Sequence, residues 1–260
     1  MAIFRGSVVS RVLECECSLQ VIVPWDLYDF KNNSHHPRIE KTVILLHGLR
    51  QNADDWVRYT NIARYANELG YAVVIPDLQR SFCLDMAHGP KYFTFINEEL
   101  PQIIDALFKL PTDKDHLYIA GLSMGGYGSI KSALTFPDKY TGAICLSSAL
   151  YLLNRPEQCL GKAAAYAKNE LQGVIGMDLK TGPQDDVRAL ARSASESKYK
   201  PCIYMACGDC DGNHNENREM SEYLCALGIP SHFDSIAGGH YWDVWDKGIH
   251  LGLQYMNSHY

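Results

Sequence analysis

The sequence contains no run of lysine or arginine and no apolar stretch of about 18 residues, the length that a membrane-spanning helix needs. Together with a formal net charge of −6, the first absence argues against a nucleic-acid groove, which requires a basic face. The N-terminus also lacks a basic region followed by an apolar stretch of roughly 7–15 residues, so we expect no secretory signal and a cytoplasmic location. We therefore expect neither a nucleic acid nor a membrane as a partner.

The cysteines give no sign of a disulfide framework or a metal centre. There are nine, an odd number, and without export most of them should be reduced core residues. Cys207 and Cys210 have C-x-x-C spacing, but no second pair completes a zinc site and no βαβ start makes them a thioredoxin motif. His35 and His36 lie in a polar stretch that we interpret as a solvated loop. We expect no metal and no cofactor.

What the sequence does contain is ample material for one large core. Of its 260 residues, 47% are hydrophobic and 21% are charged, which is ordinary for a globular protein. Strands are predicted at 7–13, 17–23, 41–46, 72–75, 117–120, 142–147, 201–206 and 231–236, and helices at 54–69, 92–110, 127–136, 161–171, 186–191, 216–227 and 242–256. This alternation predicts a single α/β domain over residues 1–260, with a mostly parallel sheet, helices on both faces and an antiparallel pair at one edge.

One segment does not fit the simple alternation. Residues 149–195 contain no obvious strand and are long for a connection between neighbouring elements. We interpret this segment as a cap or lid insertion over the site rather than a separate domain.

A G-x-S-x-G motif at residues 121–125 lies between a buried strand and a helix. This is the context of a nucleophile elbow, in which a strained turn holds the hydroxyl of Ser123 clear of the sheet. The two flanking glycines remove side chains that would collide with neighbouring elements. The alternative is a glycine-rich turn whose serine only caps the helix. A base and an acid later in the chain would distinguish the two interpretations.

His240 and an aspartate supply those two groups. Among ten histidines, His240 alone follows both the last strand and two glycines. Asp209 and Asp211 both lie in the turn after strand 201–206. Asp211 is the favoured acid because it lies deeper in the loop, and Asp209 remains the alternative acid. A calcium loop is disfavoured because His214 stands where such a loop needs glycine. Serine, aspartate and histidine in this order form the α/β-hydrolase arrangement, with histidine as general base and aspartate orienting it.

The segment after strand 41–46 begins with His47-Gly48, at the edge of the sheet where ligands bind in α/β folds. In a serine hydrolase this loop donates one amide to the oxyanion hole. We therefore predict the N–H groups of Leu49 and Met124 as that hole. An ordinary turn between strand and helix is the alternative for this segment.

Several motifs together resemble the esterase D group of α/β-hydrolases, and within it the bacterial tributyrin-type short-chain esterases. They are His47-Gly48 with Asn52 and Asp55-Trp56, Ser81-Phe82 with Asp85, Tyr92-Phe93, Glu99-Leu100-Pro101, residues 121–128, and residues 239–243. The resemblance is strong over residues 40–150 and looser over 200–255. By this resemblance Ser123, Asp211 and His240 match the catalytic triad, and Leu49 with Met124 match the oxyanion amides. The family usually has Gly-Thr-Glu-Asp where this chain has Gly-Asp-Cys-Asp at 208–211.

The resemblance implies a serine carboxylesterase that hydrolyses short-chain acyl esters of small molecules through an acyl-enzyme intermediate. The group also includes S-formylglutathione hydrolases, feruloyl and acetyl-xylan esterases and mycolyl-type acyltransferases. A carbohydrate-directed esterase and an S-formylglutathione hydrolase are therefore the alternatives, and an inactive hydrolase-fold binding protein is the alternative from another class. We expect Trp242 and the 149–195 segment to bound the acyl and alcohol pockets, and a homo-oligomeric state is left open.

Overall fold

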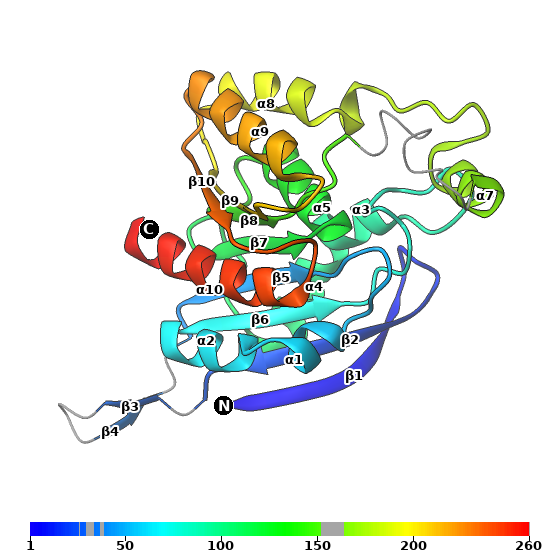
Figure 1. The fold of residues 1–260 in the computed structure, drawn as a ribbon. Coiled ribbons are helices and arrows are strands. Elements are labelled where there is room, and N and C mark those ends of the chain that lie inside the picture. The colour runs from blue at the N-terminus through cyan, green and yellow to red at the C-terminus, as the bar shows by residue number, and fades with distance from the viewer. Residues whose placement is uncertain (26, 30–33, 37–38, 152–163, 260) are drawn as a thin grey trace.

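The computed structural model describes residues 1–25, 27–29, 34–36, 39–151 and 164–259. An eight-stranded sheet runs through its centre in the order β1-β2-β6-β5-β7-β8-β9-β10 (Figure 1). The strands are β1 (Ala2–Ser10), β2 (Cys15–Val23), β5 (Lys41–Leu46), β6 (Tyr71–Pro76), β7 (Leu117–Leu122), β8 (Gly142–Leu146), β9 (Cys202–Gly208) and β10 (Ser231–Ile236). The α/β class with a mostly parallel sheet is thereby confirmed.

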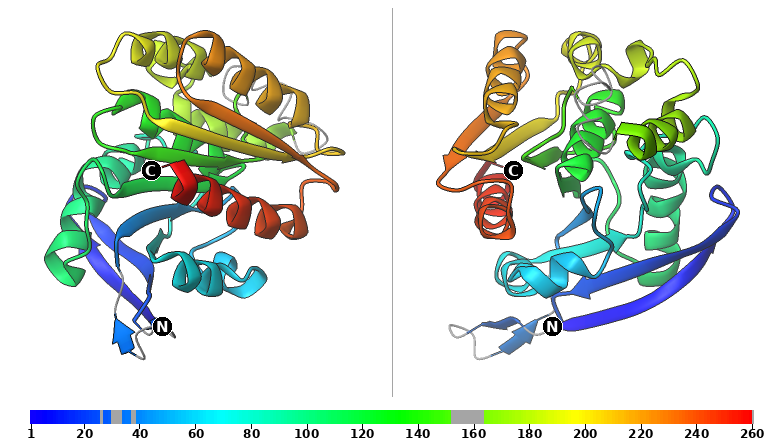
Figure 2. Two further views of the ribbon diagram at one scale, coloured as in Figure 1. Left: turned by 90° about the vertical axis from the view of Figure 1, so that its left-hand side faces the viewer. Right: turned by 45° about the vertical axis from the view of Figure 1, so that its right-hand side comes forward.

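The sheet is parallel from β6 through β5 to β10, whereas β1 pairs antiparallel with β2 and β2 pairs antiparallel with β6. Figure 2 shows β1 and β10 at opposite edges of the twisted sheet. Every residue of β5 through β9 is buried, because helices cover both faces of these strands. Their carboxyl ends therefore meet at one rim of the sheet, where the loops gather.

Two helical layers enclose the sheet. One face carries α1 (Asp55–Tyr59), α2 (Ile62–Leu69) and α10 (Trp242–His259), and the other carries α4 (Leu100–Phe108), α5 (Met124–Thr135), α8 (Val187–Ser195) and α9 (His214–Ala226). Each layer has its own apolar core: Trp56, Ile62 and Ile249 belong to the first, and Ile104 and Ile130 to the second. Among the described helices, none combines the length and the hydrophobicity that a membrane span requires.

The helix predicted over 54–69 is interrupted, so that prediction is wrong in detail. The chain leaves helical geometry at Thr60 and Asn61, between α1 and α2. The Asn61 N–H donates to Asp246 of α10 at 2.8 Å, and Tyr65 donates its hydroxyl hydrogen to the same carboxylate at 2.9 Å. A partner on a distant helix therefore fixes this break.

The predicted helix over 92–110 is present but contains a π-helical turn. It consists of α3 (Tyr92–Thr94), η1 (Phe95–Glu99) and α4. Pro101 cannot donate to the carbonyl of Asn97 and its ring would crowd that oxygen in a regular helix. The wider turn relieves the crowding, and the Asn97 carbonyl instead accepts a hydrogen bond from Lys139.

The stretch predicted as a polar loop contains a short antiparallel hairpin, β3 (Leu27–Asp29) paired with β4 (Ser34–His36), so the loop prediction is wrong for these residues. Within the predicted cap, the described part contains α7 (Ala164–Ile175), η2 (Pro183–Asp185) and α8. Residues 152–163 lie outside the described residues. α8 packs on α5 in the layer that covers the sheet, whereas α7 lies beyond the carboxyl ends of the strands (Figure 1).

Candidate active site

Ser123 occupies a sharp turn between β7 and α5. Its backbone has φ 53° and ψ −111°, a conformation that L-residues adopt only when the surroundings impose it. A Cβ atom at Gly121 would lie 2.5 Å from the backbone of Gly125, and a Cβ at Gly125 would lie 2.5 Å from the Leu46 oxygen. Only glycine fits at these two positions, so the turn has the geometry of a nucleophile elbow.

The loops after β9 and β10 bring Asp211 and His240 to the same place. His240 Nε2 lies 3.2 Å from Ser123 Oγ, and His240 Nδ1 lies 2.7 Å from Asp211 Oδ2. Asp211 also accepts the Asn213 N–H at 2.9 Å. The structure therefore joins the three residues singled out from the sequence into one hydrogen-bonded chain.

Asp211 is held as a carboxylate. Burial by itself raises the pKa of this group, but hydrogen bonds from His240, the Asn213 N–H and the Ser147 hydroxyl outweigh it, so the pKa lies below its usual value. An ionised partner at Nδ1 fixes that nitrogen as the one that carries the proton. Nε2 then presents its lone pair to the Ser123 hydroxyl.

Asp209, the alternative acid, points elsewhere. Its side chain is exposed and accepts the Gly238 N–H at 3.0 Å, two residues before His240. The pKa of Asp209 is lowered by this backbone hydrogen bond and by one from Cys210. Asp209 thus ties the loop that carries the histidine to the loop that carries Asp211, without touching the imidazole.

A pocket of about 450 Å³ opens beside Ser123 and His240. Its other lining residues are Gly48, Leu49, Arg50, Gln51, Leu122 and Trp245. The N–H groups of Leu49 and Met124 have no acceptor among the described residues, and Met124 is the first residue of α5, where backbone N–H groups lack helical partners. Trp242 is absent from this wall; it packs behind Trp245, with ring centroids 5.2 Å apart.

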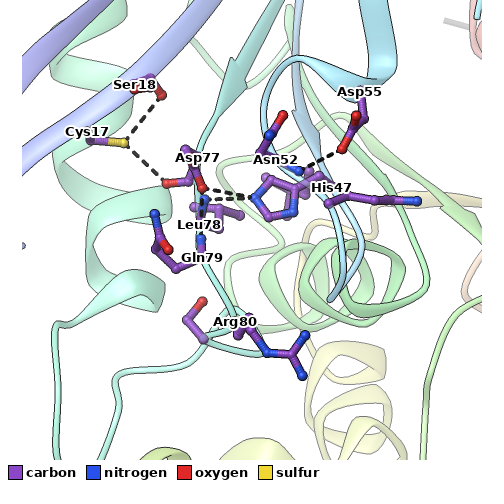
Figure 3. Close-up of polar contacts among 12 residues, drawn as sticks. Cys17, Ser18, His47, Asn52, Asp55, Asp77, Leu78, Gln79 and Arg80 are labelled. Atoms are coloured by element: carbon purple, nitrogen blue, oxygen red, sulfur yellow. Dashed lines mark hydrogen bonds and ion pairs between the residues drawn. The ribbon is translucent and has the colours of Figure 1, made fainter. Parts of the chain in front are cut away.

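His47 has a role that sequence reasoning missed, since it was singled out only as half of a His-Gly motif. Its side chain is fully buried, and Figure 3 shows it reaching from the end of β5 toward Asp77 and Leu78. The Leu78 N–H donates to Nε2 at 2.9 Å, so the ring proton is on Nδ1, which donates to the Gly48 oxygen at 2.8 Å. Asp77 Oδ1 lies 3.5 Å from Nε2.

This bond orients a particular peptide unit. The Gly48 carbonyl and the Leu49 N–H belong to one planar trans peptide, so they point in opposite directions. By holding the carbonyl, His47 directs the Leu49 N–H away from itself. Arg80 holds the next peptide, because its guanidinium donates to the Leu49 oxygen at 3.2 Å and is paired with Glu170 of α7.

No group of three or more histidine, cysteine or acidic side chains that could hold a metal ion occurs in the described part of the chain. The chemistry available at this rim is that of an activated hydroxyl, an imidazole held by a carboxylate, and backbone N–H groups.

Comparisons with known proteins identify related esterases. The family model described as "Putative esterase" matches residues 10–255. An acetyl esterase of Caldicellulosiruptor saccharolyticus is 32% identical over 267 residues, covering 99% of each chain. Among solved structures, FphF, a fluorophosphonate-binding serine hydrolase of Staphylococcus aureus, superimposes with a TM-score of 0.84 at 31% identity, and 98% of each chain is covered.

The S-formylglutathione hydrolase FrmB of Staphylococcus aureus superimposes with a TM-score of 0.82, again at 31% identity over 98% of each chain. These matches confirm the resemblance to esterase D-type hydrolases that the motifs indicated. The chain therefore belongs to the Putative esterase family and is a serine hydrolase of the α/β-hydrolase type.

Proposed function

We propose that Ser123 is the nucleophile of a carboxylesterase for short acyl groups, with His240 as general base and Asp211 orienting it. The observation that carries this proposal is the continuous contact from Asp211 through His240 to Ser123, at 2.7 and 3.2 Å. The N–H groups of Leu49 and Met124 are the proposed oxyanion hole. We also propose one domain over residues 1–260, while the lid role of the 149–195 segment, the cytoplasmic location and the oligomeric state stay predictions.

The reaction follows from these positions. Ser123 Oγ attacks the acyl carbonyl carbon while its proton passes to His240 Nε2, and the carbonyl oxygen becomes an anion that accepts the two N–H groups. Collapse of the intermediate breaks the bond to the alcohol, which leaves with the proton from Nε2 and leaves the acyl group on Ser123. Water then attacks that ester, gives a proton to Nε2, and releases the acid as Ser123 regains its proton.

The size of the acyl group is proposed from two observations. The pocket beside Ser123 has a volume of about 450 Å³, which is enough for a small ester. The relative that matches along its whole length is an acetyl esterase. Acetyl esters of small alcohols are therefore the proposed substrates.

The test compares wild type with Ser123→Ala on p-nitrophenyl acetate and butyrate. Loss of the nucleophile should lower kcat by at least about 10⁴-fold while leaving the fold intact by circular dichroism. Labelling by a fluorophosphonate should disappear with the same substitution. A Ser123→Ala protein that keeps wild-type turnover would refute the proposal, and a wild type without labelling or turnover would revive the binding-protein alternative.

Arg50 favours a second candidate, the hydrolysis of S-formylglutathione. Its side chain is exposed on the pocket wall. Among the described residues it has no partner, and none of those that line the wall carries a carboxylate. An unpaired guanidinium there suits a substrate that carries carboxylates, as the glutathione part does.

Arg50→Gln separates the two candidates. If Arg50 binds a substrate carboxylate, the substitution raises KM for S-formylglutathione by about tenfold and changes p-nitrophenyl acetate turnover far less. Steady-state kinetics on both substrates, at two ionic strengths, gives the comparison. A wild type that does not hydrolyse the thioester rules the second candidate out. A panel of acyl chain lengths and feruloyl esters checks the carbohydrate-directed alternative.

A further inference from the structure

Ser147 lies behind the proposed catalytic pair in a strained conformation. It follows β8 directly, is fully buried, and has φ 45°. Its N–H donates to the Ala206 oxygen at 2.8 Å, which fixes the residue against β9. A non-glycine residue at positive φ is kept only where its surroundings hold it, so the position of this hydroxyl is well determined.

Two neighbouring side chains donate hydrogen bonds to the Ser147 hydroxyl. Oγ accepts the indole N–H of Trp245 at 3.0 Å and the Cys207 thiol at 3.6 Å, and these occupy both lone pairs. The single hydroxyl hydrogen is then available to the Asp211 carboxylate, whose pKa it helps to lower. The indole N–H polarises the Ser147 hydroxyl and makes it a better hydrogen-bond donor.

The same indole contacts the other member of the pair. The rings of Trp245 and His240 are perpendicular, with centroids 4.9 Å apart and an interplanar angle of 88°. Asn213 completes the arrangement, since its side chain donates to the Ser147 carbonyl at 3.2 Å while its N–H donates to Asp211. Carboxylate and imidazole are thus each held by this buried group of contacts.

We propose that Ser147 and Trp245 are positioning residues that act on the reaction through Asp211 and His240. This inference rests on the proposed function, because it needs Asp211 and His240 to be the working acid and base. It adds that the pair is aligned by a tryptophan and a serine from two other elements, α10 and the end of β8. Neither residue donates or accepts a proton in the reaction.

The test uses Ser147→Ala, Trp245→Phe and the double variant, with Ser148→Ala as the matched control. Ser148 is the neighbouring buried serine, and its hydroxyl has no hydrogen-bond partner among the described residues. Trp245→Phe removes the N–H donor but retains an aromatic ring against His240. Each variant is assayed for kcat, KM and the pH profile of kcat/KM on p-nitrophenyl acetate.

Each single variant should lower kcat by roughly tenfold, with little change in KM, because alignment rather than binding is affected. Without the hydroxyl donor the Asp211 carboxylate attracts the imidazole proton more strongly, so the acid limb of kcat/KM should move to higher pH by roughly half a unit. The double variant should lose little more than the worse single variant, because both act through one hydroxyl.

Two results would overturn the inference: an acid limb that does not move upward in either single variant, or a kcat loss in Ser148→Ala equal to that in Ser147→Ala. If circular dichroism shows that Ser147→Ala does not fold, the acid limb and the kcat of Trp245→Phe are compared with those of Ser148→Ala by the same two criteria. These outcomes differ from failure of the proposed function, which would appear as unchanged turnover in Ser123→Ala.

Discussion

At the scale of single residues, two aspartates two positions apart have different tasks. Asp211 is buried and contacts His240, whereas Asp209 is exposed and accepts the Gly238 N–H of the loop that carries the histidine. Asp211→Asn should lower kcat by about 10⁴-fold, because an amide no longer fixes the imidazole tautomer. Asp209→Asn is the matched variant and should lower kcat by less than about tenfold, because an amide oxygen still accepts the Gly238 N–H. Steady-state kinetics on p-nitrophenyl acetate would contradict this assignment if the order were reversed.

His47 offers a second residue-scale prediction. An asparagine side chain reaches about as far as Nδ1 and can still donate to the Gly48 oxygen, whereas a glutamine reaches about as far as Nε2 and cannot. His47→Gln should therefore lower kcat more than His47→Asn, by up to about 10²-fold, the order of effect seen when an oxyanion donor is lost. Kinetics decide this, with thermal unfolding as the control, because both variants disturb a buried site and should be similarly destabilised. Equal kcat values in the two variants would contradict the role given to the Gly48 carbonyl.

At the scale of elements, an ion pair with little exposure connects η2 to α5, the helix that follows Ser123. Lys131 of α5 lies 2.7 Å from Asp185 of η2, and their side chains are 5% and 14% exposed. Asp185→Asn leaves a buried ammonium without its counter-ion and should cost on the order of 3 kcal/mol of unfolding free energy. Lys131→Met should cost less unfolding free energy, because the unpaired charge that it leaves is on Asp185, the more exposed of the two side chains.

Urea unfolding of both single variants and the double variant measures this coupling. The double variant should be more stable than Asp185→Asn alone, since the uncompensated charge is gone. Strictly additive losses would show that the pair contributes nothing beyond its separate side chains. The Tyr127 hydroxyl donates to the Asp185 backbone carbonyl, so this second fastening is retained in every variant.

The central strands and most helices could be predicted because their signal is local. Continuous apolar runs such as 41–46 and 72–75 mark strands buried on both faces, and Gly70 ends α2 with a positive φ of 76°. The break at Thr60 and the carbonyl partner of Asn97 could not be predicted, because Asp246 and Lys139 come from distant elements.

The same division applies to the site. Ser123 and His240 were predictable, because each lies in a glycine-rich turn straight after a strand. Ser147 was not, because its partners Cys207 and Trp245 are 60 and 98 positions away. From the sequence alone, the residues around Ser147 indicate only the end of a strand. The positive φ at a serine is a property of the folded chain and leaves no mark in the sequence.

At the scale of the whole molecule, the packing divides the thiols into two classes. Cys15, Cys210 and Cys225 are exposed, whereas Cys17, Cys83, Cys145, Cys202 and Cys207 are buried. Burial raises the pKa of Cys17, Cys83 and Cys207 to about 12, so their reactive thiolate forms are scarce as well as inaccessible.

A thiol titration with a coloured disulfide reagent tests this division. Cys159 lies outside the described residues, so the experiment uses a Cys159→Ser variant. Three thiols should react quickly in the native protein and five more only after unfolding in guanidinium, since all eight are free. Fast reaction of more than three thiols would contradict the burial of the core cysteines. Fewer than eight after unfolding would reveal a disulfide.

The order of the strands has one more consequence. The proposed nucleophile and oxyanion donors come from the first 151 residues, while the proposed acid and base follow β9 and β10. The two sets meet along the parallel border between β8 and β9. A polypeptide cut in the connection between these strands would yield two inactive fragments, each with half of the reactive groups. Tethered to two proteins that bind one another, the fragments would regain ester cleavage only on reassembly, which would turn this hydrolase into a reporter of association.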